Sequence, residues 1–411
     1  MKTICPITIL IEVFFMKTNI AVFFGCRSVE HEVSIISAVQ AMRAINREKY
    51  DVTPVYVSKD GTMYTGEKLF EIESFRDIPA LLKASERITF IRDGKAVLMH
   101  HLDSKGLRRK KDIAVDVAFP IVHGTNCEDG TIAGYLEYLG LPYIGCDILS
   151  ASVGMDKAVF KDVLRAAGLP VLDCVRFRSR EYALKHDEII AEITEKVGFP
   201  LIIKPINLGS SVGITKVKTA EELEDAIRLA VSFSDKILAE KAIENLREIN
   251  CSVLGDPDSC EASVCEEPFM NDEILSYEDK YMGGKNSGPS KGMASLGRKI
   301  PADLDESKSD EIRELSCKVF KAIGASGVVR IDYLLDTASG EVYANEINTI
   351  RGSLAFYLWE ATGLKYTDMI DRLVDIAFRR ERNRENLTFT IDTNILSGVS
   401  FGSKSSKGGK L

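Results

Sequence analysis

Two neighbouring apolar segments near the end of the chain carry polar side chains that could bind a metal. The segment VRIDYLLDTASGEVYANEINT, residues 329–349, places Asp332 in the first and both Glu346 and Asn348 in the second. In extended strands, residues two apart share a face, so these three side chains could converge. Converging carboxylates repel each other unless a cation lies between them, and such oxygen ligands suit magnesium beside phosphates. Pairing with Arg330 or exposure to water is the competing interpretation.

A lysine followed by a glycine- and serine-rich loop is the second candidate. Lys204 ends the apolar segment PLIIK, and the loop INLGSSVGI that follows contains Ser210 and Ser211. Backbone N–H groups and hydroxyls of such a loop can surround phosphates, and the lysine adds a compact positive charge. The loop is not a Walker motif, and hairpin turns use the same residues about as often. Lys157, near the start of a helical segment, is a further cation, although a solvated lysine is common there.

Carboxylates at other segment ends are weaker candidates. Glu240 ends the apolar segment KILAE, and Glu248 follows eight residues later. Carboxylates there could accept hydrogen bonds from an adenine amino group or a ribose hydroxyl, although exposed glutamates are commoner. Glu30 in GCRSVEHEVS and Glu128 in VHGTNCEDGT follow strand ends, where open α/β sheets bind ligands. A turn or cap role is the alternative for Glu128.

The segments that must position these residues alternate between strand and helix patterns, which predicts an α/β protein. Gly168 and Pro170 are expected to end the helix that contains Lys157. The expected strands are 19–25, 51–58, 115–124, 171–177, 200–205, 236–243, 248–255 and two within 329–349. The expected helices are 34–45, 130–140, 155–168, 184–198, 220–231 and 309–324.

Size and composition indicate a multi-domain globular protein. The chain has 411 residues, 45% apolar and 28% charged, with a net charge of -8. These values argue against a nucleic-acid partner, and no window has the length of a membrane helix. The nine cysteines form no C-x-x-C pair, which favours reduced thiols in the cytoplasm. The first 15 residues contain Glu12 and no cleavage site, so we expect a spurious leader before Met16.

Taken together, six blocks in order resemble the D-alanine–D-alanine ligase family of ATP-grasp enzymes, from about residue 19 to about residue 380. The blocks are GCRSVEHEVS, HGTNCEDGTIAGYLEYLGLPYIG, MDKAVFKDVLRAAGLP, IIKPINLGSSVGI, YEDKY, and RIDYLL with NEINTIRG. The resemblance implies a three-domain ATP-grasp architecture, in which a parallel α/β domain precedes two α+β domains that enclose the nucleotide. The expected domains are a substrate domain 16–146, a central domain 147–243 and a metal-binding domain 244–385. They follow the leader 1–15 and precede the segment 386–411, whose Gly, Ser and Lys content predicts a mobile tail.

The resemblance also implies the reaction and its residues. Two D-alanines are joined through an acyl phosphate, with release of ADP and phosphate, for peptidoglycan synthesis by a cytoplasmic homodimer. ATP and two Mg²⁺ or Mn²⁺ ions are expected, with Asp332, Glu346 and Asn348 as metal ligands. The implied catalytic residues are Glu30, Ser210, Tyr281, Arg330 and Gly352. The implied nucleotide-binding residues are Lys157, Lys204, Ser210, Ser211, Glu240, Lys241, Glu248 and Lys280.

Within that resemblance, some roles are more specific. Glu30 would bind the ammonium of the first amino acid, in a network with Ser210 and Tyr281. Arg330 would stabilise the acyl phosphate and the tetrahedral intermediate. Lys280 and Tyr281 would lie on a lid whose closure excludes water.

One segment departs from the family pattern. The chain reads NTIRGSLAFYLW, so Arg351 replaces a proline and Tyr357 occupies the place of a serine that holds the carboxylate of the second substrate. Arg351 could clamp a carboxylate or face solvent. Two alternatives therefore stay open: a ligase that uses D-lactate, D-serine or another amino acid second, and a nucleotide-binding homologue without catalysis.

Overall fold

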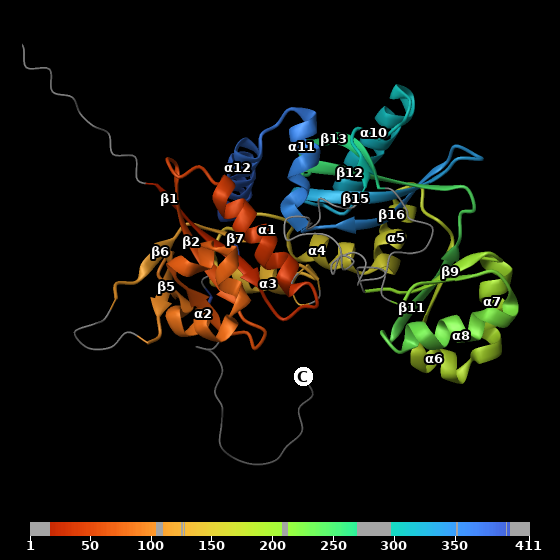
Figure 1. Cartoon of the computed structure of the whole chain (residues 1–411), viewed down its shortest axis with the longest axis horizontal. Helices are drawn as coiled ribbons and strands as arrows, with labels where there is room; N and C mark the ends of the chain where they lie inside the picture. Colours follow the sequence, from red (N-terminus) through yellow and green to blue (C-terminus); the bar gives the residue numbers. More distant parts are fainter. Residues whose placement is uncertain are drawn as a thin grey trace, which may run out of the picture.

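A computed structural model describes residues 17–103, 110–124, 126, 128–207, 213–268, 297–350, 352–391 and 393–394. These residues form three β-sheets with helices around them (Figure 1). Several predicted positions lie outside the described residues, so their predictions stay untested. They are the leader 1–15, Ser210, Ser211, Lys280, Tyr281, Arg351 and most of the tail 386–411.

The first sheet has the strand order β6-β5-β4-β3-β2-β1-β7 and is mixed. β1 runs parallel to β2 and to β7, whereas β3 to β6 continue the sheet antiparallel. The α/β class is confirmed, but the sheet is parallel only at one end. The strands are β1 Thr18–Gly25, β2 Tyr50–Val57, β3 Met63–Thr65, β4 Glu86–Asp93, β5 Ala96–His101, β6 Ile113–Val115 and β7 Val117–Pro120.

The antiparallel part was not predicted because its strands alternate in burial or are very short. β4, for example, buries only Ile88 and Phe90 of its eight residues, so it lacks the continuous apolar run of a strand buried on both faces. The helical elements in this part of the chain are α1 His31–Ala44, η1 Glu67–Phe70, η2 Ile72–Arg76, α2 Ile78–Ala84 and α3 Thr131–Leu139.

The second sheet has four strands in the order β10-β9-β11-β8. Its core is formed by apolar residues of the strands and of the helices α7 and α8, such as Ile203, Ile193 and Ile227. In Figure 1 this unit lies at the lower right. Its elements are β8 Cys174–Arg178, α6 Ser179–Leu184, α7 His186–Lys196, β9 Leu201–Pro205, β10 Thr215–Val217, α8 Ala220–Val231 and β11 Lys236–Lys241.

The third sheet has five strands in the order β14-β13-β12-β15-β16. Helix α10 packs on it through Ile312, Val319 and Phe320. Phe160 and Leu164 of α5 join the same core, so α5 packs with this sheet although it precedes the second sheet in the chain. The elements are α4 Ile148–Met155, α5 Lys157–Ala166, β12 Leu246–Gly255, β13 Cys260–Pro268, β14 Arg298–Lys299, α10 Glu306–Ala322, β15 Gly327–Asp336 and β16 Val342–Asn348.

The last helix that the structure describes packs against the first sheet. Three elements follow β16: η5 Gly352–Ala355, α11 Phe356–Thr362 and α12 Tyr366–Glu385. Met369, Ile370 and Leu373 of α12 share a core with residues of β1 and α1, and α12 lies beside the first sheet in Figure 1. The hydroxyl of Thr367 also donates to the carbonyl of Ala44 at 2.9 Å. The first and third sheets are thus joined by an apolar interface, which fixes their loops relative to each other.

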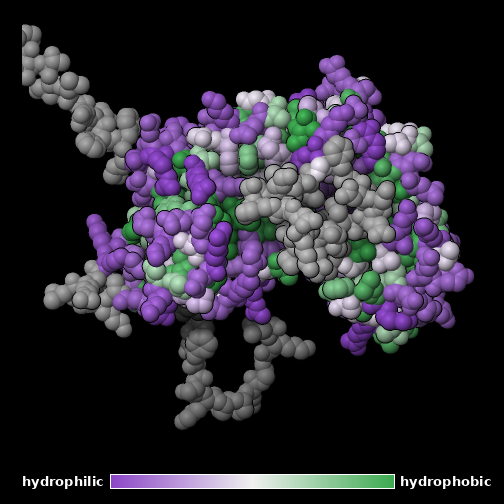
Figure 2. Space-filling model, in the orientation of Figure 1, coloured by the Kyte–Doolittle hydropathy of each residue, from purple (hydrophilic) through white to green (hydrophobic). Residues whose placement is uncertain are grey.

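Hydrophilic side chains cover most of the visible rim of the molecule (Figure 2), which agrees with the charged composition. Among the described residues, every helix is too short or too polar to cross a membrane. The domain boundaries at 146, 243 and 385 remain predictions.

Candidate active site

The paired strands β15 and β16 bring the predicted metal ligands together. Their antiparallel register places Asp332 opposite Glu346, and Arg330 opposite Asn348. Asp332 alternates with the fully buried Ile331 and Tyr333, so it faces away from the α10 core. The convergence expected from the sequence is therefore observed.

The two carboxylates of this group pair with cations of the chain. Nε of Arg330 donates to Oδ1 of Asp332 at 2.6 Å, and Nη2 donates to Oδ2. The amide of Asn348 also donates to Oδ2 of Asp332, at 3.3 Å. Nζ of Lys157 lies 3.2 Å from Oε2 of Glu346. Asp332 thus pairs with Arg330, as the competing interpretation of the sequence expected. Glu346 pairs instead with Lys157, a lysine of α5.

The charge state of Glu346 suits cation binding. Burial alone would raise the pKa of this carboxyl, but Lys157 and Lys204 lower the pKa of Glu346 to about 2. Burial also lowers the pKa of Arg330, and the carboxylate of Asp332 more than offsets this, so the pKa of Arg330 is raised. Both residues are therefore charged at neutral pH.

The donor set fits a magnesium or manganese ion in chemical type. Asp332 and Glu346 offer carboxylate oxygens, and Asn348 offers an amide oxygen, which are the ligands that these cations prefer. Within the part of the chain that is described, no cluster of three or more His, Cys, Asp or Glu side chains forms a metal site. An ion here would thus need further oxygens, such as those of phosphates.

Lys204 and Glu240 lie together on the second sheet. β9 and β11 pair antiparallel, with Lys204 opposite Leu238. Nζ of Lys204 donates to Oε1 of Glu240, and also to Oδ1 of Asn345 on β16 at 3.1 Å. Lys204 and Glu240 are 4% and 3% exposed. This contact joins the second sheet to the strand that carries Glu346.

The sequence prediction missed Lys161, a second lysine on the same carboxylate. Lys161 is fully buried on α5, and its Nζ lies 3.1 Å from Oε2 of Glu240. Burial alone would raise the pKa of Glu240, but Lys161 and Lys204 lower the pKa of Glu240 to about 2. Lys161 follows Lys157 by four residues, so both project from one side of the helix. That spacing in MDKAVFK was the signal available in the sequence.

The other two predicted nucleotide-binding residues that the structure describes are Lys241 on β11 and Glu248 on β12. Lys241 follows Glu240 on β11, and its Nζ donates to the carbonyl of Phe199 at 3.0 Å. Glu248 is partly buried on β12, opposite Leu334 of β15. Alternation along a strand explains why Lys241 points away from Glu240.

The loop before α1 presents Glu30. His31 holds this loop: Nδ1 donates to the carbonyl of Cys26 at 2.6 Å, and Nε2 accepts from the hydroxyl of Tyr56 at 2.9 Å. Burial lowers the pKa of His31, which favours the neutral ring. A Cβ on Gly124, at φ +78°, would lie 3.2 Å from Oε2 of Glu30. The Glu30 carboxylate therefore lies against Gly124 in the loop that follows β7, and a larger residue at position 124 would displace this carboxylate.

The side chain of Glu128 connects its own loop, residues 121–130 between β7 and α3, to the segment after β16. Its Oε2 accepts from the N–H of Gly124 at 2.7 Å, and its Oε1 accepts from the N–H of Ile350 at 3.1 Å. His123 adds a donation from Nδ1 to the carbonyl of Ile350 at 2.8 Å. Gly352, which opens η5, is thus held close to the first sheet. Glu128 acts as a connection between loops, which is nearer to the cap role considered for it.

Glu266 on β13 is a second residue that the sequence prediction missed. It is 2% exposed, and its Oε1 accepts from the hydroxyl of Tyr357 at 2.9 Å and from Nδ2 of Asn250 at 2.9 Å. Nη1 of Arg330 lies 3.4 Å from the same oxygen, and Nη1 of Arg298 lies 3.5 Å from Oε2. These partners come from four different elements, so no local pattern could have indicated them.

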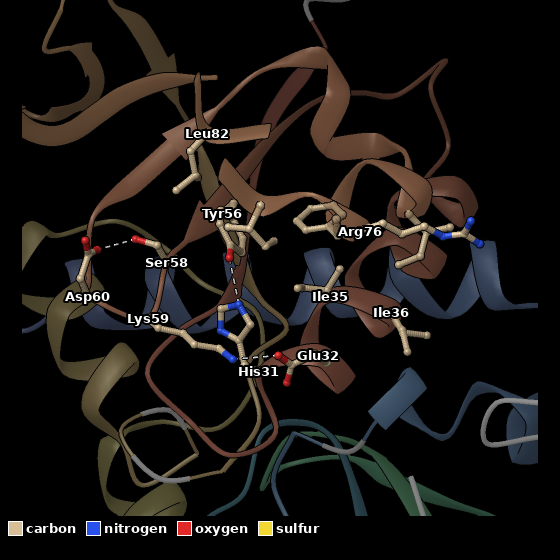
Figure 3. A pocket seen from close by; sticks show the side chains of 13 residues that line it. His31, Glu32, Ile35, Ile36, Tyr56, Ser58, Lys59, Asp60, Arg76 and Leu82 are labelled. Carbon is tan, nitrogen blue, oxygen red and sulfur yellow. Dashed lines mark hydrogen bonds and ion pairs between the residues drawn. The ribbon is translucent and has the colours of Figure 1, made fainter. Parts of the chain in front are cut away.

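A cavity of about 610 Å³ lies between α1, the end of β2, η2 and α2 (Figure 3). Its walls include Ile35, Tyr56 and Leu82, with the Lys59–Glu32 ion pair at its edge. None of the predicted site residues lines it. The residues that could hold a nucleotide therefore lie elsewhere, between the second and third sheets.

Known proteins are similar to this chain along most of its length. Family models described as D-ala D-ala ligase N-terminus and D-ala D-ala ligase C-terminus match residues 19–146 and 163–375. A D-alanine–D-alanine ligase from Thermosipho melanesiensis is 37% identical over 92% of this chain and 98% of its own.

Two solved structures are similar along most of the chain. The D-alanine–D-alanine ligase from Coxiella burnetii has a TM-score of 0.72 at 29% identity, covering 90% of this chain and 96% of its own. The VanG D-Ala:D-Ser ligase from Enterococcus faecalis has a TM-score of 0.73 at 31% identity, covering 88% of this chain and 100% of its own.

Proposed function

The chain belongs to the D-alanine–D-alanine ligase family, and we propose on this premise how its own residues carry out the reaction. It is an ADP-forming ligase that joins two D-alanines at the expense of ATP, in the synthesis of peptidoglycan. The carboxylate of the first D-alanine attacks the γ-phosphorus and forms an acyl phosphate with release of ADP. The amine of the second D-alanine then attacks the acyl carbon and releases phosphate.

The proposed nucleotide site is the group of lysines between the second and third sheets, which are Lys157, Lys161 and Lys204. Lys204 and Lys157 would contact phosphates, and Glu240 and Glu248 would accept hydrogen bonds from the adenosine. Lysines near a transferring phosphoryl group offset its negative charge, which is the main contribution that a protein makes to this chemistry. Ser210, Ser211, Lys241 and Lys280 stay in the proposed nucleotide-binding set.

For the metal, Asp332, Glu346 and Asn348 would hold up to two Mg²⁺ or Mn²⁺ ions. Bound metal would neutralise charge on the phosphates and orient them. Arg330 and Lys157 now neutralise the two carboxylates, so these side chains would exchange partners when a metal and a nucleotide are bound. Lys157 would then be available for phosphate.

For the first D-alanine, Glu30 would bind the ammonium group, with Ser210 and Tyr281 as its network partners. Arg330 would stabilise the negative charge that develops on the acyl phosphate and on the tetrahedral intermediate. Gly352, held near the first sheet through Glu128 and His123, would contribute its backbone to the same centre. This places the first amino acid where the loops of the first sheet meet the end of β16.

A second candidate function, with a different second amino acid, also has support. Tyr357 donates to Glu266, which also contacts Arg330, so Tyr357 is one residue away from the proposed reacting centre. Arg298 stacks over the Tyr357 ring, 4.5 Å from its centroid. Because the similar VanG protein is a D-Ala:D-Ser ligase, D-serine is the second candidate for the amine substrate.

The observation that carries the proposal is the paired register of β15 and β16, which puts Asp332 and Glu346 opposite each other beside Arg330 and Lys157. The test is ADP release with D-alanine as the sole amino acid, followed by product identification by mass. D-alanyl-D-alanine is expected. ADP release only in the presence of D-serine would move the activity to the second candidate, and no ADP with either would refute catalysis.

We further propose a cytoplasmic homodimer. The family resemblance is what supports it. Light scattering of the purified full chain at micromolar concentration would give twice the 45.5 kDa chain mass, and a mass of one chain would contradict the dimer.

A further inference from the structure

Lys161 is a buried cation for which the proposed reaction has no direct use. It is 0% exposed, so no nucleotide can reach its ammonium group in this conformation. Burial lowers the pKa of Lys161, and the carboxylate of Glu240 opposes this shift by favouring the charged ammonium. Its Nζ has no hydrogen-bond partner among the described residues, and its ion pair is with Glu240 at 3.1 Å.

The charges around Glu240 do not balance. One carboxylate meets two ammonium groups: Lys204 at Oε1 and Lys161 at Oε2. The further contact of Lys204 is the neutral amide oxygen of Asn345, and Glu346 has its own partner in Lys157. The buried cluster of Lys161, Lys204 and Glu240 therefore carries an excess of one positive charge, which an anionic ligand would offset.

We propose that Lys161 is a positioning residue of the nucleotide site, which keeps Glu240 neutralised and in place when Lys204 leaves that carboxylate for the nucleotide phosphates. The inference rests on the proposed function, because it takes Lys204 and Glu240 as nucleotide-binding residues. With two lysines on opposite oxygens, one can change partner while the other remains. Glu240 then keeps its orientation toward the adenosine throughout.

Without the charge of Lys161, Lys204 would be the one cation left on Glu240. Moving Lys204 to a phosphate would then strand a buried carboxylate, which costs several times the thermal energy. ATP binding should weaken for this reason. The amino-acid sites and the chemical step, which Lys161 does not touch, should be unaffected once ATP is saturating.

The test is Lys161→Met in the full chain, because methionine has a similar length without charge. We expect the Kd for ATP, measured by calorimetry, to rise by about tenfold or more. The KM for D-alanine and the kcat at saturating ATP should stay within about twofold. The matched control is Lys196→Met, which removes an exposed lysine paired with Glu192 at 2.7 Å, and it should leave all three values unchanged.

A double variant shows whether Lys161 acts through Glu240. In a Glu240→Gln background there is no carboxylate to neutralise, so adding Lys161→Met should change the Kd for ATP by less than about twofold. An equally large loss in both backgrounds would overturn the proposal in favour of a purely structural lysine. Should Lys161→Met alone fail to fold, the Glu240→Gln protein and the double variant decide, and a further loss of ATP affinity in the double variant refutes the proposal.

The outcome also separates this inference from the proposed function. If the unaltered chain does not bind ATP, the nucleotide site itself is refuted. If it binds ATP and Lys161→Met binds equally well, the inference on Lys161 fails and the proposed function stands.

Discussion

The proposed site has two ends, a nucleotide end around Glu240 and an amine end around Glu266, and the buried carboxylate at each end has different partners. At the nucleotide end, Glu240 is shared by the ammonium groups of Lys161 and Lys204. At the amine end, Glu266 accepts hydrogen bonds from the neutral Tyr357 and Asn250, with Arg330 at a longer distance. The first end therefore holds surplus positive charge, and the second holds a network of fixed geometry.

The difference matches what each end must recognise. A nucleotide brings several negative charges, so surplus lysines that can change partner are useful. A second amino acid differs from its competitors by one small group, and discrimination of that kind depends on placed hydrogen-bond partners and on shape. Substitutions at the nucleotide end should therefore change the affinity for ATP. Substitutions at the amine end should change which second amino acid is used and how tightly it binds.

The largest effect is expected where the two ends meet, at the metal ligands. Glu346→Gln removes the charge of a proposed ligand but keeps its size, and we expect turnover to fall by more than about 100-fold. The measurement is ADP release over a range of Mg²⁺ concentrations. Glu341→Gln, an exposed glutamate just before β16, is the control. Turnover near that of the unaltered chain in Glu346→Gln would exclude the metal assignment.

Arg330 lies between the ends, and its change should separate chemistry from nucleotide binding. Lysine cannot reproduce the two-pronged contact that Arg330 makes with Asp332, so Arg330→Lys should lower kcat by about 100-fold, the size of effect seen when a transition-state donor is lost. The Kd for ATP should change by less than about threefold. Arg313→Lys, on an exposed pair of α10, serves as the control, and a loss confined to ATP affinity would contradict the assignment.

At the amine end, Tyr357→Phe removes one hydroxyl and keeps the ring. Losing the hydrogen bond to Glu266 should cost about 1 kcal/mol and raise the KM for the second amino acid by about fivefold. The Kd for ATP should not change. Steady-state kinetics with separate first- and second-site terms would measure this, with Tyr343→Phe on β16 as the control. If Tyr357→Phe changed the Kd for ATP and not the KM for the second amino acid, the two ends would not differ in what they bind.

At the proposed nucleotide end, the stability of the folded state should also depend on pH. The pKa of Glu240 is lowered from 4.5 to about 2, so its ion pairs stabilise the folded state above pH 4.5, and this contribution is lost as the pH falls toward 2. The stability difference between the unaltered chain and Glu240→Gln should therefore shrink by up to about 1.4 kcal/mol per pH unit below pH 4.5. Urea unfolding at about pH 5.5 and about pH 3.5 checks this. A constant difference would mean that folding does not lower the pKa of Glu240, and a difference that grows as the pH falls would mean that folding raises it.

The same two ends show which site residues could be predicted from the sequence. Asp332, Glu346 and Asn348 were placed correctly on one face because alternation in two consecutive strands is a local property. Glu266 was missed because its partners lie 16, 64 and 91 residues away, so only the folded chain brings them together. Lys161 could have been found from its spacing to Lys157, but helical spacing alone does not show burial.

The fold divides in a similar way. The parallel strands β1, β2 and β7 each contain at least four consecutive buried residues and were predicted. The antiparallel β3 to β6 bury one face at most and were not predicted. The packing of α5 on the third sheet depends on Phe160 and Leu164 meeting residues of β16 and α10. Contacts between distant segments of this kind leave no periodic pattern in the sequence.

The central claim is that this chain activates a carboxylate as an acyl phosphate beside Arg330. The most direct measurement is a reaction with ATP, Mg²⁺ and D-alanine whose carboxylate carries ¹⁸O, followed by mass analysis of the phosphate and the dipeptide. When the amine displaces the acyl phosphate, the bridging oxygen leaves with the phosphate, so we predict one ¹⁸O in each phosphate released along with D-alanyl-D-alanine. Phosphate without ¹⁸O would show that water, and not the amino-acid carboxylate, accepts the phosphoryl group, and would contradict the account.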